Sequence, residues 1–181
     1  MHALPQGYLN DTDLAEHRIQ RTTIVVAWLD TKPVGIGWMH WDGPRDAALM
    51  NSLGRVPEIH RLHINKRYRS FGLGSRIISS FELLAIERGL TWIGLGVHLK
   101  NHRATALYQR LGFRETGERY VDEFIVKEPN GMAYQVREPS VYMTRELIGS
   151  NRTNSDQRAR PPAEVRSATM PVTMRESNWS T

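Results

Sequence analysis

The apolar positions along the chain follow two different periods, and their order predicts a sheet with helices packed on it. Six runs rich in β-branched and aromatic residues predict strands: residues 23–29, 34–41, 58–64, 92–99, 113–120 and 140–147. The first two flank a turn at residues 30–33 and predict a hairpin. The fourth has almost no charge, as expected of a strand buried in the centre of a sheet.

Apolar residues that recur every three or four positions predict helices between these strands. They do so in residues 73–88 and, after an Asn cap, in residues 101–111, and a glycine follows each repeat. Residues 11–20 predict a short first helix, and the glycines and proline of residues 42–56 predict a loop. The order is a β-meander followed by strand, helix, strand, helix and strand. It predicts the α/β class, as a mixed (α+β) sheet with helices packed on it.

Composition adds a domain boundary to this picture. The 181 residues are 40% hydrophobic and 24% charged, which suits one globular domain. From residue 150 onward the chain has neither period, and its polar residues and Pro-Pro pair do not provide a core. We therefore expect a folded domain at residues 1–149 and a disordered polar tail at residues 150–181.

Composition and charge also exclude several classes of function. The absence of Cys excludes disulfides, thiolate zinc sites and a Cys nucleophile. The net charge of +5 is small for a nucleic-acid-binding surface, and the basic residues are not interleaved with stacking aromatic ones. No apolar run reaches the roughly 18 residues of a membrane-spanning helix, and no signal-like segment begins the chain. We expect a cytoplasmic protein with neither a membrane nor a nucleic-acid partner.

The junction between the third strand and the helix at residues 73–88 is the first candidate site. Its sequence over residues 67–75 is Arg-Tyr-Arg-Ser-Phe-Gly-Leu-Gly-Ser. A helix N-terminus has unpaired backbone N–H groups and partial positive charge, and glycines there let a phosphate approach closely. Lys66, Arg67 and Arg69 add positive charge. By itself the junction also fits an ordinary tight turn, since the Walker and Rossmann fingerprints are absent.

The second candidate is the predicted helix at residues 101–111. Asn101 is its expected cap, and Tyr108 lies on the apolar face one turn after Ala104. A buried tyrosine hydroxyl needs a polar partner. By itself Tyr108 fits a core tyrosine bonded to a carbonyl as well as a catalytic group.

Together the two stretches are similar to two motifs of one known superfamily. The pattern Arg-x-x-Gly-x-Gly at residues 69–74 resembles the acyl-CoA pyrophosphate signature of the GNAT superfamily of N-acetyltransferases. The pattern Asn-x-x-Ala-x-x-Leu-Tyr-x-x-x-Gly-Phe at residues 101–113 resembles the second CoA-side motif of the same superfamily. The resemblance covers residues 24–147 and implies the GNAT-like acyl-CoA N-acyltransferase fold, with a central, mostly antiparallel sheet. Since only residues 1–22 precede the predicted hairpin, the first strand of that fold is expected to be short or missing.

The resemblance also implies roles for individual residues. Acetyl-CoA would be the acyl donor, without a metal. Pantetheine would bond the backbone of the third strand at Leu62, His63 and Ile64. The pyrophosphate would be held by the loop and the first helical turn: Arg69, Ser70, Phe71, Gly72, Leu73, Gly74 and Ser75. Asn101 would contact the cofactor arm, Tyr108 would protonate the leaving thiolate, and Glu58 would take the proton of the amine. In this superfamily Gly is usual at the position of Ser70.

Several alternatives stay open at this point. Glu58 also fits a solvated carboxylate at a strand end, with His60 as a second candidate base. His60 and His63 are three residues apart, which on a regular strand places them on opposite faces and disfavours a zinc site. Acidic side chains in or beside loops are candidates for attracting a cationic amine: Asp42, Asp46, Asp122 and Glu123.

Three functions remain. The first is an acetyl-CoA-dependent N-acetyltransferase acting on a primary amine of a small molecule. The second is acetylation of a protein N-terminus or lysine, and the third is a non-catalytic module that binds CoA or nucleic acid. The oligomeric state stays open, with a homodimer as one candidate.

Overall fold

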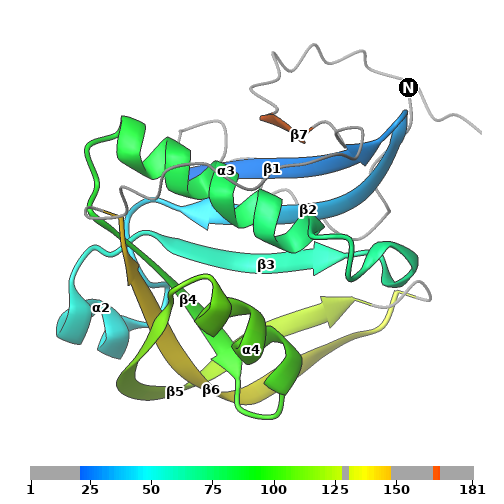
Figure 1. Cartoon of the computed structure of the whole chain (residues 1–181). Coiled ribbons are helices and arrows are strands. Elements are labelled where there is room, and N and C mark those ends of the chain that lie inside the picture. The colour runs from blue at the N-terminus through cyan, green and yellow to red at the C-terminus, as the bar shows by residue number, and fades with distance from the viewer. Residues whose placement is uncertain (1–20, 128–130, 148–164, 168–181) are drawn as a thin grey trace, which may run out of the picture.

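The structure is a computed structural model that describes residues 21–127, 131–147 and 165–167 (Figure 1). The described strands form one mixed sheet in the order β5-β6-β4-β3-β2-β1-β7. Their bounds are β1 (Thr22–Leu29), β2 (Lys32–His40), β3 (Glu58–Ile64), β4 (Trp92–His98), β5 (Arg114–Lys127), β6 (Ala133–Glu146) and β7 (Val165–Ser167). The helices are α2 (Ala47–Leu53), the 3-10 turn η1 (Lys66–Tyr68), α3 (Leu73–Glu87) and α4 (His102–Arg110).

The sheet is antiparallel except at one place. β1, β2 and β3 form an antiparallel meander, and β6 pairs antiparallel with β4 on one side and with β5 on the other. α3 connects β3 to β4, which are therefore parallel neighbours in the middle of the sheet. The predicted class, a mixed sheet of mostly antiparallel strands with flanking helices, is confirmed.

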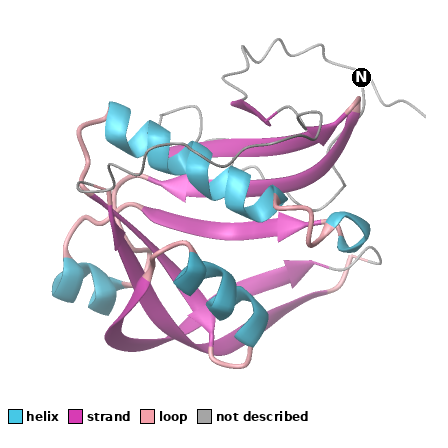
Figure 2. Ribbon diagram, in the orientation of Figure 1, coloured by secondary structure: helices cyan, strands magenta, loops and turns pink. Residues whose placement is uncertain are grey.

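Each face of the sheet has its own apolar cluster. α3 and α4 lie on one face, α3 along β1, β2 and β3 (Figure 2). The larger cluster lies beneath them and includes Ile77, Phe81, Ile93, Leu95, Tyr108 and Met143. The smaller cluster lies on the opposite face and consists of Ile24, Val26, Ile36 and Trp38, with Trp28 packed against it. This alternation along β1 and β2 is the period-two pattern of a sheet that is covered on both sides.

The structure corrects three of the predicted boundaries. The predicted loop at residues 42–56 contains α2, because the Asp46 side chain accepts from the Leu49 N–H and caps a short run of helix-forming residues. The predicted loop between the last two strands is mostly strand, since β5 and β6 pair from Arg114 to Lys127. The hairpin, the strand at Glu58–Ile64, both long helices and the central strand agree with prediction to within two residues.

The third correction concerns the tail. Residues 165–167, which were expected to be disordered, form β7 and pair antiparallel with Val25, Val26 and Ala27 of β1. The predicted helix at residues 11–20 lies outside the described residues, as does the place of a first strand before the hairpin.

Candidate functional site

The central feature of the site is the separation of β3 from β4. The two strands pair only where β3 begins, Glu58 with Gly94 and Ile59 with Leu95 in the middle of β4. Both continue for several residues beyond this point, paired only to their outer neighbours β2 and β6. Figure 1 shows β4 running away from β3. The inner edges of two parallel strands therefore carry backbone N–H and C=O groups that no described strand pairs.

A bulge in β3 contributes to this separation. Arg61 has a φ of 51°, in the left-handed region, and the β2–β3 register shifts between Ile36 and Trp38. Because of the shift, His63 is the register partner of Ile36 and His60 that of Trp38, and both partners belong to the smaller cluster. His60 and His63 consequently lie on the same face, and the prediction of opposite faces is wrong. Within the described residues no group of three or more His, Asp or Glu side chains is arranged to hold a metal ion.

The N-terminus of α3 lies next to the end of β3. Gly72 precedes the helix in the left-handed conformation, with a φ of 77°, and no side chain caps it. The first intrahelical bond runs from Arg76 N to the Gly72 carbonyl at 3.1 Å, so the amides of residues 73–75 have no partner within the helix. A Cβ built on Gly72 meets nothing within 4 Å. These donors face open space, which suits an anionic group.

Side chains hold this loop in place from two sides. The Arg69 Nε donates to the Ile64 carbonyl at 2.9 Å, which ties the loop to the end of β3. An Nη of Arg103 in α4 donates to Ser70 Oγ at 2.7 Å. Ser70 has a φ of 70°, a conformation that glycine adopts most easily, which explains in physical terms why Gly suits this position. Phe71 is 65% exposed at the tip of the loop.

α4 packs beside the N-terminus of α3. A Cβ on Gly74 would be 3.6 Å from a methyl group of Leu107. The Asn101 side chain accepts from Ala104 N at 3.2 Å, so the predicted cap is confirmed. The amide group of Asn101 is therefore partly committed to the helix itself.

Tyr108 is buried in the larger cluster on the helix-covered face. It is 8% exposed, and its ring lies 6.0 Å from that of Phe113. Burial raises the pKa of its hydroxyl to about 12, so the group keeps its proton throughout the neutral range. Burial is the one cause of this increase, and no hydrogen bond to another described residue contributes to it.

Glu58 begins β3 with a buried carboxyl group on the opposite face. It is 6% exposed, and its Oε2 accepts from the backbone N–H of Arg45 at 3.1 Å. Burial raises the pKa of this carboxyl to about 7, with Asp122 adding to the increase and the Arg45 hydrogen bond opposing it. A carboxyl group that titrates near neutral pH is suited to accept and release protons.

Two tyrosines beside Glu58 were not recognised from the sequence. A Cβ on Gly94 would collide with the Tyr142 hydroxyl, and one on Gly96 would collide with that of Tyr120. The two rings are 6.4 Å apart and nearly perpendicular. The detectable signal was the Gly-x-Gly pattern inside a predicted central strand, since a strand glycine marks the close approach of another group.

The other candidate base is disfavoured by its surroundings. His60 is buried beside Trp38, with ring centroids 6.4 Å apart. Burial lowers the pKa of its imidazole to about 3, and the charges of Arg45 and Arg61 act in the same direction. An imidazole that binds a proton this weakly is a poor base, which leaves Glu58 as the better candidate.

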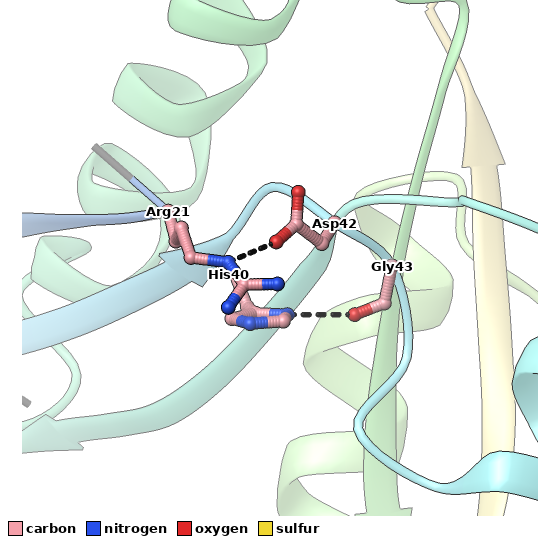
Figure 3. Close-up of polar contacts among 4 residues, drawn as sticks. All are labelled: Arg21, His40, Asp42 and Gly43. Atoms are coloured by element: carbon pink, nitrogen blue, oxygen red, sulfur yellow. Dashed lines mark hydrogen bonds and ion pairs between the residues drawn. The ribbon is translucent and has the colours of Figure 1, made fainter. Parts of the chain in front are cut away.

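Most of the acidic side chains considered as amine attractors have other partners. Asp42 forms a salt bridge with Arg21 at 2.5 Å, and this salt bridge lowers the pKa of the Asp42 carboxyl. Figure 3 shows it beside the contact between His40 Nδ1 and the Gly43 carbonyl. Asp46 caps α2, and Glu123 pairs with Arg137 at 2.8 Å. Asp122 differs, because burial and the nearby Glu138 raise the pKa of its carboxyl. The charges of Asp46 and Asp122 each raise the pKa of both Glu58 and Tyr120.

The sequence matches a known family. The sequence profile described as "Acetyltransferase (GNAT) family" matches residues 3–113. The uncharacterised protein YyaT of Bacillus subtilis is 28% identical over 108 residues, which cover 60% of this chain and 62% of that protein. A putative acetyltransferase of the same organism is 29% identical over 82 residues, or 45% of this chain and 54% of its own length. The matched regions thus span less than two thirds of either relative.

Solved structures with a similar fold agree with this match. An IAA acetyltransferase from Bacillus cereus has a TM-score of 0.55 at 18% identity, covering 80% of this chain and 93% of its own. A ribosomal-protein alanine N-acetyltransferase from Escherichia coli scores 0.53 at 19% identity, covering 83% and 84%. A Bacillus subtilis acetyltransferase in complex with CoA scores 0.52 at 18% identity, covering 76% and 85%. At these identities the likeness concerns the fold. No helix in the described ranges is long and apolar enough to cross a membrane.

Proposed function

Because the chain belongs to the acetyltransferase (GNAT) family, we propose that it transfers an acetyl group from acetyl-CoA to a primary amine by direct attack in a ternary complex. One observation carries this proposal: β3 and β4 separate directly in front of the uncapped N-terminus of α3. The separation leaves an unpaired strand edge, and the helix N-terminus leaves donors for an anion. Acetyl-CoA has an amide-containing arm, which can pair with the strand edge, followed by a pyrophosphate, which can bind at the helix N-terminus.

The donor would lie along β3 and end at the loop. Backbone groups of Leu62, His63 and Ile64 would bond the pantetheine amides, since β3 lacks a partner strand on that side. The backbone amides from Arg69 to Ser75 would hold the pyrophosphate beside Gly72, where the space is open. Asn101 would contact the arm at the start of α4. When bound, acetyl-CoA supplies an acetyl group activated as a thioester.

Glu58 would act as the general base. An amine attacks through its lone pair, so it must lose a proton before or during attack. The buried carboxyl, with a pKa of about 7, is partly ionised at neutral pH and can take that proton. One of its oxygens already accepts from Arg45, which leaves the other for the amine or for a bridging water.

Tyr108 would donate from the opposite side of the sheet. Its hydroxyl keeps its proton at neutral pH, because burial raises its pKa to about 12. A thiolate leaves more easily when a donor bonds or protonates the sulfur. Glu58 would therefore act on the attacking amine and Tyr108 on the leaving thiolate.

The covering of the acceptor face favours a small amine. The segment before β3 crosses this face: Arg45 contacts Glu58 of β3, and Ser52 bonds Glu118 of β5 at 2.5 Å. We take these two contacts as support for a narrow acceptor site. The alternative acceptor is a protein N-terminus or a lysine side chain, the class named for the similar Escherichia coli fold.

The test is release of free CoA thiol from acetyl-CoA in the presence of an amine panel. The panel should contain small primary amines, N-terminal dipeptides and a lysine peptide, with mass spectrometry of the product. Amine-dependent thiol release with an acetylated small amine is the expected result. Tight acetyl-CoA binding without release for any acceptor would instead indicate a non-catalytic CoA-binding module.

A further inference from the structure

Three fully buried polar atoms without a hydrogen-bond partner stand out in the described part of the chain. They are Trp38 Nε1, His60 Nε2 and the Tyr142 hydroxyl. All three come from the sheet face that carries Glu58, since Trp38 belongs to the smaller cluster and is the register partner of His60. Burying a polar group without a partner is unfavourable, so such atoms mark places where the working protein provides one.

Of the three, the Tyr142 hydroxyl lies next to Glu58. Tyr142 is fully buried on β6 (0% exposed), and its hydroxyl extends over Gly94 of β4. Gly94 is the register partner of Glu58, so the Glu58 side chain starts from the adjacent strand at the same level. The absence of a Cβ at Gly94 is what allows the hydroxyl to reach this position.

The surroundings of Glu58 offer few other donors. Arg45 supplies one backbone N–H to Oε2. The register partner on β2 is His40, whose Nδ1 contacts the Gly43 carbonyl, and His60 follows on β3. Asp46 before α2 and Asp122 on β5 carry negative charge and oppose ionisation of Glu58. Tyr120 completes the surroundings from β5, over Gly96.

We propose that Tyr142 is a positioning residue for Glu58, whose carboxylate accepts a hydrogen bond from the Tyr142 hydroxyl directly or through one water. This inference rests on the proposed function, in which Glu58 is the base. During the reaction the amine nitrogen would bond the acetyl carbon while the thioester C–S bond breaks, with the CoA sulfur leaving as a thiol after protonation. The amine proton would pass to Glu58, and the Tyr142 hydroxyl would keep its own proton. Burial raises the pKa of that hydroxyl far above neutral, so it acts only as a donor.

The chemistry of the two oxygens explains why a second donor is needed. The Arg45 N–H holds only one oxygen of the carboxylate. The carboxylate can therefore still rotate, which exchanges its two oxygens or moves the free oxygen away from the amine. A fixed hydroxyl beside the free oxygen restricts that movement and favours the ionised form. When the carboxyl is protonated, this hydrogen bond loses its charge-assisted character.

The direct test is titration of the Glu58 carboxyl by carbon-detected NMR in the full chain and in Tyr142→Phe. Removing a donor to the carboxylate should raise the Glu58 pKa by roughly one to two units. The Tyr134→Phe variant, which removes an exposed hydroxyl on the β5–β6 ribbon, is the matched control and should leave the titration unchanged. An identical Glu58 titration in Tyr142→Phe and in the unmodified chain would overturn the proposal, whether or not the chain is active.

Kinetics and stability provide the second measurement. The acid limb of kcat/KM for the amine should move to higher pH in Tyr142→Phe by the same amount as the NMR midpoint, with the affinity for acetyl-CoA unchanged. Because the proposed hydrogen bond is made to the ionised carboxylate, the melting temperature of Tyr142→Phe should match that of the unmodified chain at pH 5 and be lower at pH 8. A lower melting temperature with an unshifted pH profile would show a purely structural tyrosine. If the unmodified chain released no thiol with any amine, the proposed function would fail while the NMR titration still decided the role of Tyr142.

Discussion

Glu58 connects the stability of the molecule to its proposed chemistry. Its carboxyl has a pKa of about 7 in the folded chain against 4.5 in a free side chain, because burial favours the neutral form. The buried neutral carboxyl therefore contributes its full stability to the fold below pH 4.5, and this contribution is lost as the pH rises through about 7. Above that pH the molecule carries a buried carboxylate that the unfolded chain would solvate.

We therefore predict that Glu58→Gln stabilises the protein in a pH-dependent manner. The amide oxygen still accepts from Arg45, but the side chain no longer ionises. Relative to the unmodified chain, its free energy of unfolding should rise between pH 5 and pH 8 by about 2–3 kcal/mol, the equivalent of the pKa shift. Chemical denaturation at both pH values measures this. Turnover should fall sharply at both, and equal stabilisation at pH 5 and pH 8 would contradict the assignment.

Tyr108→Phe should lower turnover without disturbing the fold. The ring keeps its packing against Phe113, and the substitution removes the hydroxyl alone. Since the pKa of about 12 makes Tyr108 a weak acid compared with a thiol, the loss should be at the low end for a positioned acid, roughly 10- to 100-fold in kcat. Steady-state kinetics and melting should be measured on one preparation. Intact turnover per folded molecule would remove Tyr108 from the mechanism.

The sequence located some of the residues proposed for the site better than others. Glu58 and Tyr108 were located because they stand at fixed distances from two recognisable motifs. Tyr120 and Tyr142 could not be located in this way, because their positions depend on β6 pairing with β4 rather than on local sequence. His63 was placed on the wrong face because a left-handed residue inside a strand, here Arg61, has no signature in residue type.

At the scale of elements, hydrophobic periodicity predicted helices and strands correctly where capping residues, glycines or the lack of charge supported the same assignment. α3 and α4 have an apolar face and glycines after their ends, and β4 is uncharged, so all three were predicted almost to the residue. α2 was missed because it is one short segment between glycines and a proline, and its cap is a single Asp. The outer parts of β5 and β6 were missed because they are exposed, so no buried face imposes alternation on them.

The helix-terminus interpretation of α3 can be tested with two glycines of similar conformation. Gly72 before α3 and Gly89 after it have φ values of 77° and 72°, and a Cβ at either meets nothing within 4 Å. Gly→Ala should therefore destabilise the fold by a similar amount at both, about 1 kcal/mol. Only Gly72→Ala places a methyl group where the pyrophosphate would approach, so it alone should weaken acetyl-CoA binding, by roughly tenfold or more.

Calorimetric titration of both variants with acetyl-CoA makes the comparison. Equal affinities for acetyl-CoA in Gly72→Ala and Gly89→Ala would show that the space beside Gly72 does not receive the donor.

At the scale of the whole molecule, the order of strands in the sheet could be predicted from the sequence only in part. The meander and the two strand–helix units follow from chain order, and the parallel β3–β4 contact follows from the helix between them. The placement of β7 beside β1 does not follow, since three residues in a polar tail carry no periodic signal. As a result the tail was expected to be without structure, whereas part of it completes one edge of the sheet.

Removal of the tail should therefore affect stability but not chemistry. A chain ending at Gly149 lacks β7 and exposes the backbone of Val25, Val26 and Ala27 at the edge of β1. The lost pairing contributes a few net hydrogen bonds, about 1–3 kcal/mol, which corresponds to a fall in melting temperature of several degrees. An uncovered strand edge also favours association between chains.

The matched control is a chain ending at Ser167, which keeps β7 and should melt like the full chain. Calorimetry with light scattering compares the three, and turnover below the transition should be equal, because Glu58, Tyr108 and the α3 N-terminus lie on other elements. If the chain ending at Gly149 melted at the same temperature as the chain ending at Ser167, β7 would have no role in stabilising β1.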